Sequence, residues 1–285
     1  MKPAPFTYHA PSTVETALGI LAAVAPEDGR VLAGGQSLLP TMAFRLARPA
    51  HLVDINGIPA LSSLRNEGGE LAIGACVRHA AFHRPVTDGP LGRLLSAVVR
   101  HIAHYPIRVR GTFCGSLAHA DPASEWALAA ATLGATIVAR STTGTRKIPA
   151  DRYFKGPLMT DLKSDELLAE VRLPALPADT RFGFYEFSRR AGDYAIAMSL
   201  ATFRLRDGRI VDPRIGVGGA EGAPRRITQA EAALAGQTPD ARMFDAAAEA
   251  AAAAADPMED AQASARYRRD LVRTVVRRAL AQAAT

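Results

Sequence analysis

The sequence contains little cysteine and no long apolar run. Its two cysteines, Cys76 and Cys114, are too few for a disulfide framework, and no C-x-x-C pair is present for zinc or an iron–sulfur cluster. No stretch approaches the roughly 20 apolar residues that a membrane span requires. The N-terminus carries one lysine without an apolar segment behind it, so we predict no secretory signal. These absences favour a protein of the reducing cytoplasm.

Signatures of nucleophilic and metal catalysis are also missing. Ser116 lies in no G-x-S-x-G elbow. The pairs His79/His83 and His101/His104 have spacings that suit a metal on a helix, but neither has an H-E-x-x-H pattern or a third ligand. We therefore predict no metal site and no catalytic side chain in this chain.

Positive charge is present in excess and is concentrated at one end. The formal net charge is +6, and most of the excess lies in residues 264–285. Leu271, Val275 and Leu280 recur there at roughly helical spacing, which predicts an amphipathic helix packed on the body of the protein. Its arginines are expected to face outward: Arg266, Arg268, Arg269, Arg273, Arg277 and Arg278. Because no aromatic residues interleave with them and no recognition motif accompanies them, we predict no nucleic-acid partner.

Apolar periodicity and glycine–proline punctuation predict an α+β protein, not a strict βαβ repeat. Strands are expected at 31–33, 52–55, 71–73 and 135–140, and helices at 13–24 and 91–104. Pro122 suits the first turn of a further helix that runs to Leu133, with Asp121 as its cap. Trp126 and Tyr153 are expected in the core.

The pattern changes after a linker at Pro174–Pro177. Three strands are expected at 182–188, 195–206 and 210–218, the last two joined by a hairpin at Asp207-Gly208. Helices follow at 228–235, 242–255 and 264–283. The C-terminal domain is therefore predicted to be a three-stranded antiparallel sheet packed with helices.

The first candidate binding element is the segment GRVLAGGQSLLP (29–40). An apolar strand leads there into Gly34-Gly35 and then into Gln36 and Ser37, a pattern that can turn backbone N–H groups around a diphosphate. A tight turn that merely needs glycine is the alternative. The segment is neither a Walker A nor a Rossmann fingerprint.

The second candidate element is IRVRGTFCGSLAHADPASEWALA (107–129), which predicts a compact, donor-rich turn at 111–116. Asp121 and Glu125 follow it, and acidic groups beside a nucleotide loop commonly accept hydrogen bonds from ribose hydroxyls. The alternative is that Asp121 only caps a helix and Glu125 only favours its positive end. Together the two segments could hold one dinucleotide from two sides.

These segments, with EFSRRAGDYAIA (186–197) and SARYRRDLVRTVVRRAL (264–280), resemble the FAD-binding medium subunit of aerobic carbon monoxide dehydrogenase and its relatives, which include the flavin domain of xanthine dehydrogenase. The resemblance runs from about residue 4 to about residue 282, with the motifs in the family's order. It implies a vanillyl-alcohol-oxidase-type FAD domain over residues 1–176, built of α+β subdomains at about 1–58 and 59–176. The C-terminal domain would cover residues 177–285.

The resemblance also implies the cofactor-binding residues. The FAD diphosphate would lie on Ala33, Gly34, Gly35, Gln36, Ser37 and Leu38. The second FAD segment would consist of Thr112, Cys114, Gly115 and Ser116, with Asp121 and Glu125 beyond it. Leu168 would lie against the cofactor, and Tyr194 would cover one face of the isoalloxazine ring.

The sequence departs from the family pattern at two places. Cys114 stands where the family's T-[IL]-G-G-[NS] motif has a glycine, and a residue forced to positive φ there would weaken binding. We expect a small geometric adjustment instead. The flavin-contacting lysine of xanthine dehydrogenase falls near Tyr185, so that lysine's role is not carried over.

The function that the resemblance implies is electron transfer within a molybdenum hydroxylase. The FAD would take electrons from two [2Fe–2S] clusters of a small subunit and pass them to an external acceptor, while a large subunit with molybdopterin cytosine dinucleotide oxidises the substrate. A dimer of heterotrimers is implied, cytoplasmic or attached through its complex to the inner face of the membrane. Substrate and acceptor stay open, as do two alternatives, a stand-alone flavin oxidase or dehydrogenase and a non-catalytic nucleotide-binding module.

Overall fold

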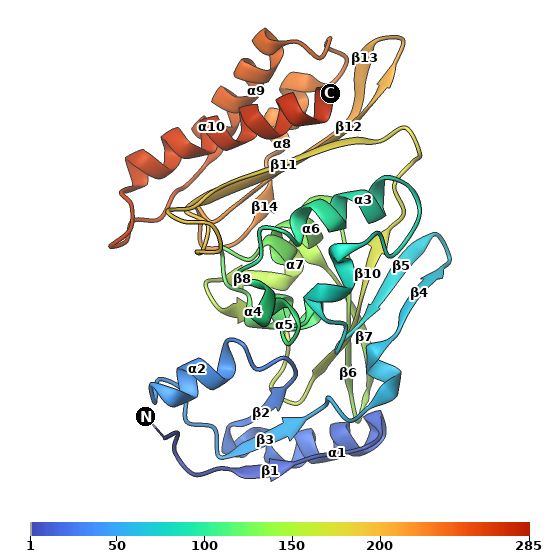
Figure 1. Ribbon diagram of the computed structural model, residues 1–285, viewed down its shortest axis with the longest axis vertical. Coiled ribbons are helices and arrows are strands. Elements are labelled where there is room, and N and C mark those ends of the chain that lie inside the picture. The colour runs from blue at the N-terminus through green and yellow to red at the C-terminus, as the bar shows by residue number, and fades with distance from the viewer. Residues whose placement is uncertain (1) are drawn as a thin grey trace.

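A computed structural model describes residues 2–285 as three stacked units (Figure 1). The first residues of the chain lie at one end of the stack, with a five-stranded sheet and its helices in the middle and the long C-terminal helix at the other end. No helix in this part of the chain is long and apolar enough to cross a membrane. The α+β architecture that the sequence predicts is confirmed.

The first unit is a small parallel sheet covered by a helix. Its strand order is β1-β3-β2, with both pairings parallel. Helix α1 begins where Thr13 accepts a hydrogen bond from the Thr16 N–H, and it buries Leu18 and Leu21. The elements are β1 (Thr7–His9), α1 (Val14–Val24), η1 (Ala25–Glu27), β2 (Gly29–Leu32), α2 (Leu38–Ala43) and β3 (His51–Asp54).

The second unit is an antiparallel sheet in the order β4-β5-β10-β6-β7. Its strands are β4 (Leu64–Glu67), β5 (Glu70–Gly74), β6 (Thr136–Ser141), β7 (Gly144–Pro149) and β10 (Leu167–Pro174), and a small hairpin is formed by β8 (Phe154–Gly156) and β9 (Met159–Thr160). The helices are η2 (Pro59–Ser62), η3 (His79–His83), α3 (Gly89–Val98), α4 (Tyr105–Arg108), α5 (Phe113–His119), α6 (Glu125–Leu133) and α7 (Ala150–Tyr153). The side chains of Trp126 and Tyr153 are fully buried, as predicted.

The third unit is a four-stranded antiparallel sheet covered on one face by helices. Its elements are β11 (Arg181–Phe187), β12 (Ala197–Arg206), β13 (Arg209–Gly218), β14 (Arg225–Arg226), α8 (Thr228–Leu234), α9 (Ala241–Ala254) and α10 (Ala265–Ala284). The three predicted strands are confirmed as β11 to β13, and the structure adds the two-residue β14 at the edge. Asp207 and Gly208 both have positive φ, as the predicted hairpin turn requires.

Helix α6 joins the second and third units. It contacts β10 on one side and β12 and β13 on the other, and every residue from Trp126 to Leu133 is buried. The hydrophobic core of the first two units also receives Phe184, Ala195, Met198 and Leu200 from the C-terminal segment, while a second core lies between β12, β13 and helices α8 to α10. The units therefore share buried side chains across their junction.

Four local predictions need correction. Helix α6 begins at Glu125, not at Pro122, because Ser124 caps it and Asp121 instead accepts a hydrogen bond from the Ala123 N–H. Helix α3 ends at Val98, short of residue 104. The predicted turn at 111–116 is largely the first part of helix α5. Arg268 does not face outward, since it is 2% exposed and its guanidinium donates to Ile196 O, Gly219 O and Asp260 Oδ2.

Candidate functional site

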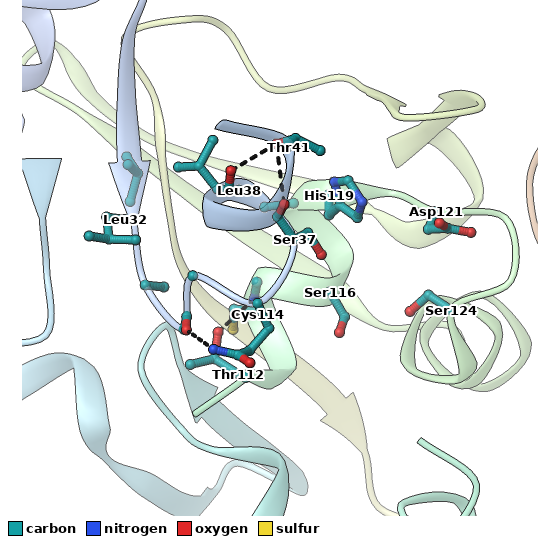
Figure 2. A pocket seen from close by; sticks show the side chains of 18 of the residues that line it. Leu32, Ser37, Leu38, Thr41, Thr112, Cys114, Ser116, His119, Asp121 and Ser124 are labelled. Atoms are coloured by element: carbon teal, nitrogen blue, oxygen red, sulfur yellow. Dashed lines mark hydrogen bonds between the residues drawn. The ribbon is translucent and has the colours of Figure 1, made fainter. Parts of the chain in front are cut away.

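A cavity of about 940 Å³ opens where the three units meet (Figure 2). It lies between the segment after β2, the start of α5, the start of α6 and the chain that leads into β12. Its lining includes every residue predicted to bind a cofactor: Ala33, Gly34, Gly35, Gln36, Ser37, Leu38, Thr112, Cys114, Gly115, Ser116, Asp121, Glu125, Leu168 and Tyr194. The tertiary structure thus brings together residues that are widely separated in the sequence.

The segment between β2 and α2 forms one wall and presents backbone donors. Gly35 has φ +71°, and the Gln36 side chain donates to Gly34 O at 3.0 Å, which holds the turn in shape. Thr41 Oγ1 donates to Leu38 O at 2.8 Å and fixes the first turn of α2. Within residues 2–285 the backbone N–H groups from Gly34 to Leu38 have no acceptor. They are available to a ligand in the cavity.

Gly34 is required where the two candidate segments touch. A Cβ atom at Gly34 would lie 2.5 Å from Arg110 O and 2.6 Å from Gly111 Cα, both backbone atoms of the second segment. No side chain can be accommodated at that distance without moving one backbone away from the other. The glycine therefore sets the spacing between the two walls of the cavity.

The second segment is organised as the N-terminus of α5. Thr112 is the N-cap, and its Oγ1 accepts a hydrogen bond from the Gly115 N–H at 3.0 Å. The Phe113 N–H is bonded to Val77 O, whereas the Cys114 N–H has no acceptor in the described chain. In Figure 2 Ser116 and His119 of this helix lie beside Ser37 of the first segment. Free donors from both segments thus border the same space.

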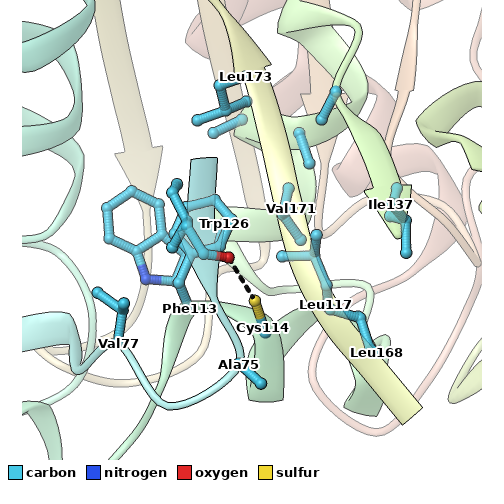
Figure 3. Packing of buried hydrophobic residues seen from close by; sticks show 14 of the residues in the cluster. Ala75, Val77, Phe113, Cys114, Leu117, Trp126, Ile137, Leu168, Val171 and Leu173 are labelled. Carbon is cyan, nitrogen blue, oxygen red and sulfur yellow. Dashed lines mark hydrogen bonds between the residues drawn. The ribbon is translucent and has the colours of Figure 1, made fainter. Parts of the chain in front are cut away.

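The Cys114 side chain turns away from this space into the core (Figure 3). The residue is 2% exposed, and its thiol donates to Ile73 O at 3.4 Å and Gly74 O at 3.6 Å. Its backbone is helical and does not have a positive φ. Burial also raises the pKa of the Cys114 thiol, so the sulfur stays protonated. The departure from the glycine motif therefore leaves the cavity wall intact.

Carboxyl groups line the part of the cavity near α6. Glu125 is in the first turn of α6. Asp121 precedes that helix, and Figure 2 shows it beside Ser124. Burial, with the negative charge of Asp121 nearby, raises the pKa of Glu125 to about 7. The pKa of the Tyr194 phenol is raised by burial of its hydroxyl end and by the carboxyls of Asp121 and Glu125. Tyr194 lines the same cavity as these two acids, although the residue as a whole is 62% exposed.

His79 is a cavity residue that sequence reasoning considered only as a metal ligand. Its Nδ1 accepts a hydrogen bond from the Trp126 indole N–H at 2.9 Å. Burial lowers its pKa to about 3, so the ring is neutral and its remaining proton is on Nε2. Among residues 2–285 no group of three or more His, Cys, Asp and Glu side chains is arranged to hold a metal ion. His79 was missed because its partner, Trp126, is distant in the sequence.

Comparisons with known proteins agree over nearly the whole chain. Residues 4–176 match the family described as FAD binding domain in molybdopterin dehydrogenase, and residues 183–283 match the CO dehydrogenase flavoprotein C-terminal domain. The nicotine 6-hydroxylase medium subunit of Paenarthrobacter nicotinovorans is 39% identical over 283 residues, covering 99% of each chain.

Solved structures show the same similarity. A chain of the carbon monoxide dehydrogenase from Hydrogenophaga pseudoflava, in the form that lacks the Mo-pyranopterin moiety, superposes with a TM-score of 0.95 at 36% identity, covering 99% of this chain and 98% of that one. Quinoline 2-oxidoreductase from Pseudomonas putida 86 gives a TM-score of 0.93 at 37% identity, covering 100% of this chain and 98% of that one. The fold and the sequence therefore lead to the same relatives.

Proposed function

Because this chain belongs to the family of FAD-binding medium subunits of molybdopterin dehydrogenases, we propose that its FAD takes electrons from the [2Fe–2S] clusters of a partner subunit and passes them to an external acceptor. Bound FAD supplies the redox chemistry, since it accepts electrons singly or in pairs. The chain contributes binding, orientation and control of access.

The observation that carries this proposal is the cavity bordered by free backbone donors from two segments. Its volume is within the range of about 300–1,000 Å³ that is usual for cofactor sites. The N–H groups from Gly34 to Leu38, with that of Cys114, would hold the diphosphate, because unpaired amides form a nest for anionic oxygens. The Ser37 and Ser116 hydroxyls would add donors.

The remaining predicted residues suit the rest of the cofactor. Asp121 would accept hydrogen bonds from hydroxyl groups of the cofactor, Glu125 would contact the cofactor beside it, and Leu168 is a buried apolar surface in the same cavity. Tyr194, on the chain that leads into β12, would lie over one face of the isoalloxazine ring. The division into a FAD-binding part over 1–176 and a C-terminal part over 177–285 is part of this proposal.

The partners follow from the family. We infer a small subunit with two [2Fe–2S] clusters and a large subunit with molybdopterin cytosine dinucleotide, assembled as a dimer of heterotrimers. The relative from Paenarthrobacter is itself called a medium subunit, which supports a multi-subunit complex. A non-catalytic nucleotide-binding module would be favoured if Cys114 disturbed cofactor binding, but its thiol points into the core and so gives that alternative no support.

Co-purification tests the proposal. An affinity-tagged full chain, expressed with its genomic neighbours, is expected to bring down two further polypeptides. The complex should contain iron, molybdenum and flavin in the proportions of two [2Fe–2S] clusters and one molybdenum per FAD. A yellow chain that is isolated alone and whose flavin is bleached directly by a small alcohol or amine would instead support a stand-alone oxidase. A colourless complex would refute the assignment.

A further inference from the structure

A buried carboxyl group lies just behind the cavity, at the junction of the second and third units. Glu186 is on β11, and its side chain is only 4% exposed. Its Oε2 has no hydrogen-bond partner in residues 2–285. The group that could provide a positive charge is the His101 imidazole. Its Nδ1 lies 3.9 Å from Glu186 Oε2, which is beyond hydrogen-bond distance. An ionised carboxylate that is buried without a partner lowers the stability of the folded protein, so the presence of Glu186 at this position needs a specific physical reason.

The groups around Glu186 offer no compensating positive charge. Its partner across the strand pair is Met198 of β12. The Arg278 guanidinium of α10 lies 4.7 Å from the centre of the Tyr185 ring, and residues 185 and 186 point to opposite faces of the sheet. The titratable groups on the Glu186 side are Glu125 of α6, with Asp121 beyond it, and His101 after α3.

Glu125 connects this buried carboxyl with the cavity. It lines the cavity from the first turn of α6, a helix that packs against β12, and β12 is the strand that pairs with β11 at Glu186. Burial, together with the negative charge of Glu125, raises the pKa of Glu186 to about 9. Two carboxyls that share poorly solvated surroundings cannot both ionise easily, and such a pair retains a proton near neutral pH.

His101 connects Glu186 with solvent. Its side chain is 42% exposed, and its ring packs edge-on against Phe184, with the centres 4.9 Å apart. Phe184 and Glu186 lie on the same face of β11, which brings the imidazole beside the carboxyl. Burial lowers the pKa of His101, so it is mostly neutral at neutral pH and can both accept and release a proton.

We propose that His101, Glu186 and Glu125 form a proton-transfer path from solvent to the cavity. The proposal rests on the proposed function, because the path leads to the place where a redox cofactor would be held. Bound FAD would supply the redox chemistry, and its two-electron reduction would be accompanied by the uptake of one proton from the protein. Glu125 would give up that proton, Glu186 would reprotonate Glu125, and the His101 imidazole would return a proton to Glu186 and recover one from water. On reoxidation a proton would leave along the same residues in the reverse direction.

The first experiment measures protonation and not activity. Infrared spectra of the full chain at neutral pH are expected to contain the carbonyl band of a protonated carboxylic acid. Glu186→Gln should strongly weaken that band and leave only the part that comes from Glu125, whereas Glu249→Gln, at an exposed carboxyl paired with Arg273, should leave it unchanged. A spectrum in which the Glu186→Gln variant keeps the wild-type band would overturn the proposal.

The second experiment follows proton uptake in the FAD-loaded chain, or in its complex, during rapid photochemical reduction with a pH-indicating dye. Glu186→Gln and Glu125→Gln should slow proton uptake about tenfold or more, since a positioned acid or base contributes about 10²–10⁴ to such transfers. Added formate should restore the rate in both variants, and imidazole should restore it in His101→Gln. Glu249→Gln is the matched control. A wild-type rate of proton uptake in Glu186→Gln would refute the path. The path would also be refuted if neither formate nor imidazole restored the rate in the variants that they are meant to rescue.

The two proposals fail in different ways. If the wild-type chain and its complex hold no FAD, the proposed function is wrong, and the infrared measurement on the flavin-free chain still decides whether the carboxyl pair holds a proton. If FAD is bound but proton uptake is unaffected, only the path is wrong. Should Glu186→Gln not fold, a pH titration of the wild-type band gives the same decision, because a band from Glu186 should persist until the pH approaches 9.

Discussion

At the residue scale, Gly34 and Cys114 both belong to the segments that border the cavity, but they have different structural roles. Gly34 keeps the first segment in backbone contact with Arg110 and Gly111 of the second segment. Cys114 lies in that second segment but contributes its side chain to the core between α5 and the strands β5 and β10. Spacing of the walls therefore depends on Gly34, whereas Cys114 mainly affects stability.

Gly34→Ala is expected to weaken FAD retention. The new Cβ would force the two segments apart, and overpacking of this kind costs about 1–3 kcal/mol, which corresponds to about 5- to 150-fold in affinity. The ratio of flavin to protein absorbance after gel filtration measures the effect. Gly19→Ala in α1 is the control, because a Cβ there meets nothing within 4 Å. Equal flavin content in both variants would contradict the role given to Gly34.

Cys114→Gly restores the family's motif and should nevertheless be harmful. Removing the buried side chain and placing glycine in a helix together cost about 1–3 kcal/mol in the free energy of unfolding. Flavin content should not change, because the thiol points away from the cavity. Urea denaturation and flavin absorbance test both expectations. A variant that is as stable as the wild type and binds FAD more tightly would show that Cys114 does perturb the site.

The buried carboxyls predict a pH dependence of stability. Both Glu125 and Glu186 have a pKa that is higher in the folded chain, about 7 and about 9, than the value of 4.5 for an unperturbed glutamate. Their stabilisation is fully present below that value and is lost as the pH rises through the folded-state pKa values. The free energy of unfolding should therefore fall from about pH 4.5 to pH 7 because of both groups and from pH 7 to pH 9 because of Glu186, by up to about 1.4 kcal/mol per pH unit for each group.

Glu186→Gln should flatten this decline, because glutamine does not titrate. The buried His79 does not interfere, since a lowered histidine pKa affects stability only below the ordinary value of 6.5. Chemical denaturation at several pH values between 7 and 9 measures the slope. Identical slopes for wild type and variant would mean that Glu186 is not protonated in the folded protein.

At the scale of elements, helix α10 is amphipathic, but its buried apolar face also includes one polar residue, Arg268. Its apolar face packs on β11 and β12, as the periodicity indicates. Arg268 is also on that face, and it donates to Ile196 O at the start of β12 and to Gly219 O after β13 at 2.8 and 2.7 Å. One guanidinium thus joins the helix to the ends of two strands, close to Tyr194.

Arg268→Leu is expected to destabilise the chain by about 3–5 kcal/mol, because it leaves buried carbonyls and Asp260 without their donor. Arg277→Leu is the matched control on the same helix, since its side chain is 55% exposed, and a change within about 0.5 kcal/mol is expected. Thermal and urea unfolding measure both. If the two variants are equally stable, Arg268 is not an anchor.

At the scale of the whole molecule, the cavity exists only because the three units pack together. The first unit supplies one backbone wall, the second supplies α5 and α6, and the segment leading into β12 supplies Tyr194. Side chains from β11 and β12 are also part of the core of the first two units. Removal of the C-terminal part would therefore open the cavity and expose α6.

Tyr194→Ala tests this closure. The variant should keep FAD, because the backbone donors are on the other walls, but the reduced flavin should react with oxygen at a different rate. Stopped-flow reoxidation in air-saturated buffer measures that rate. Tyr105→Ala is the control, as Tyr105 is 60% exposed and lies outside the cavity. An unchanged rate in Tyr194→Ala would mean that this side chain does not cover the flavin.

The sequence by itself determined the local elements and pointed to the two glycine-rich segments that border the cavity. Alternating and helical periodicities, the Asp207-Gly208 turn and the Gly34-Gly35 segment each depend on neighbouring residues, so they can be recognised without a structure. The C-terminal strands and helices were placed to within a few residues for this reason. The other predicted cofactor-binding residues came from the resemblance to the family's motifs.

Only the tertiary structure decided which way individual side chains point and what they meet. The burial of Arg268, the inward thiol of Cys114 and the burial of the unpartnered Glu186 carboxyl all depend on contacts between segments far apart in the chain. Periodicity states which face of an element is buried, but the partner that satisfies a polar group on that face comes from another unit. Those long-range contacts are what convert two glycine-rich segments into one cavity.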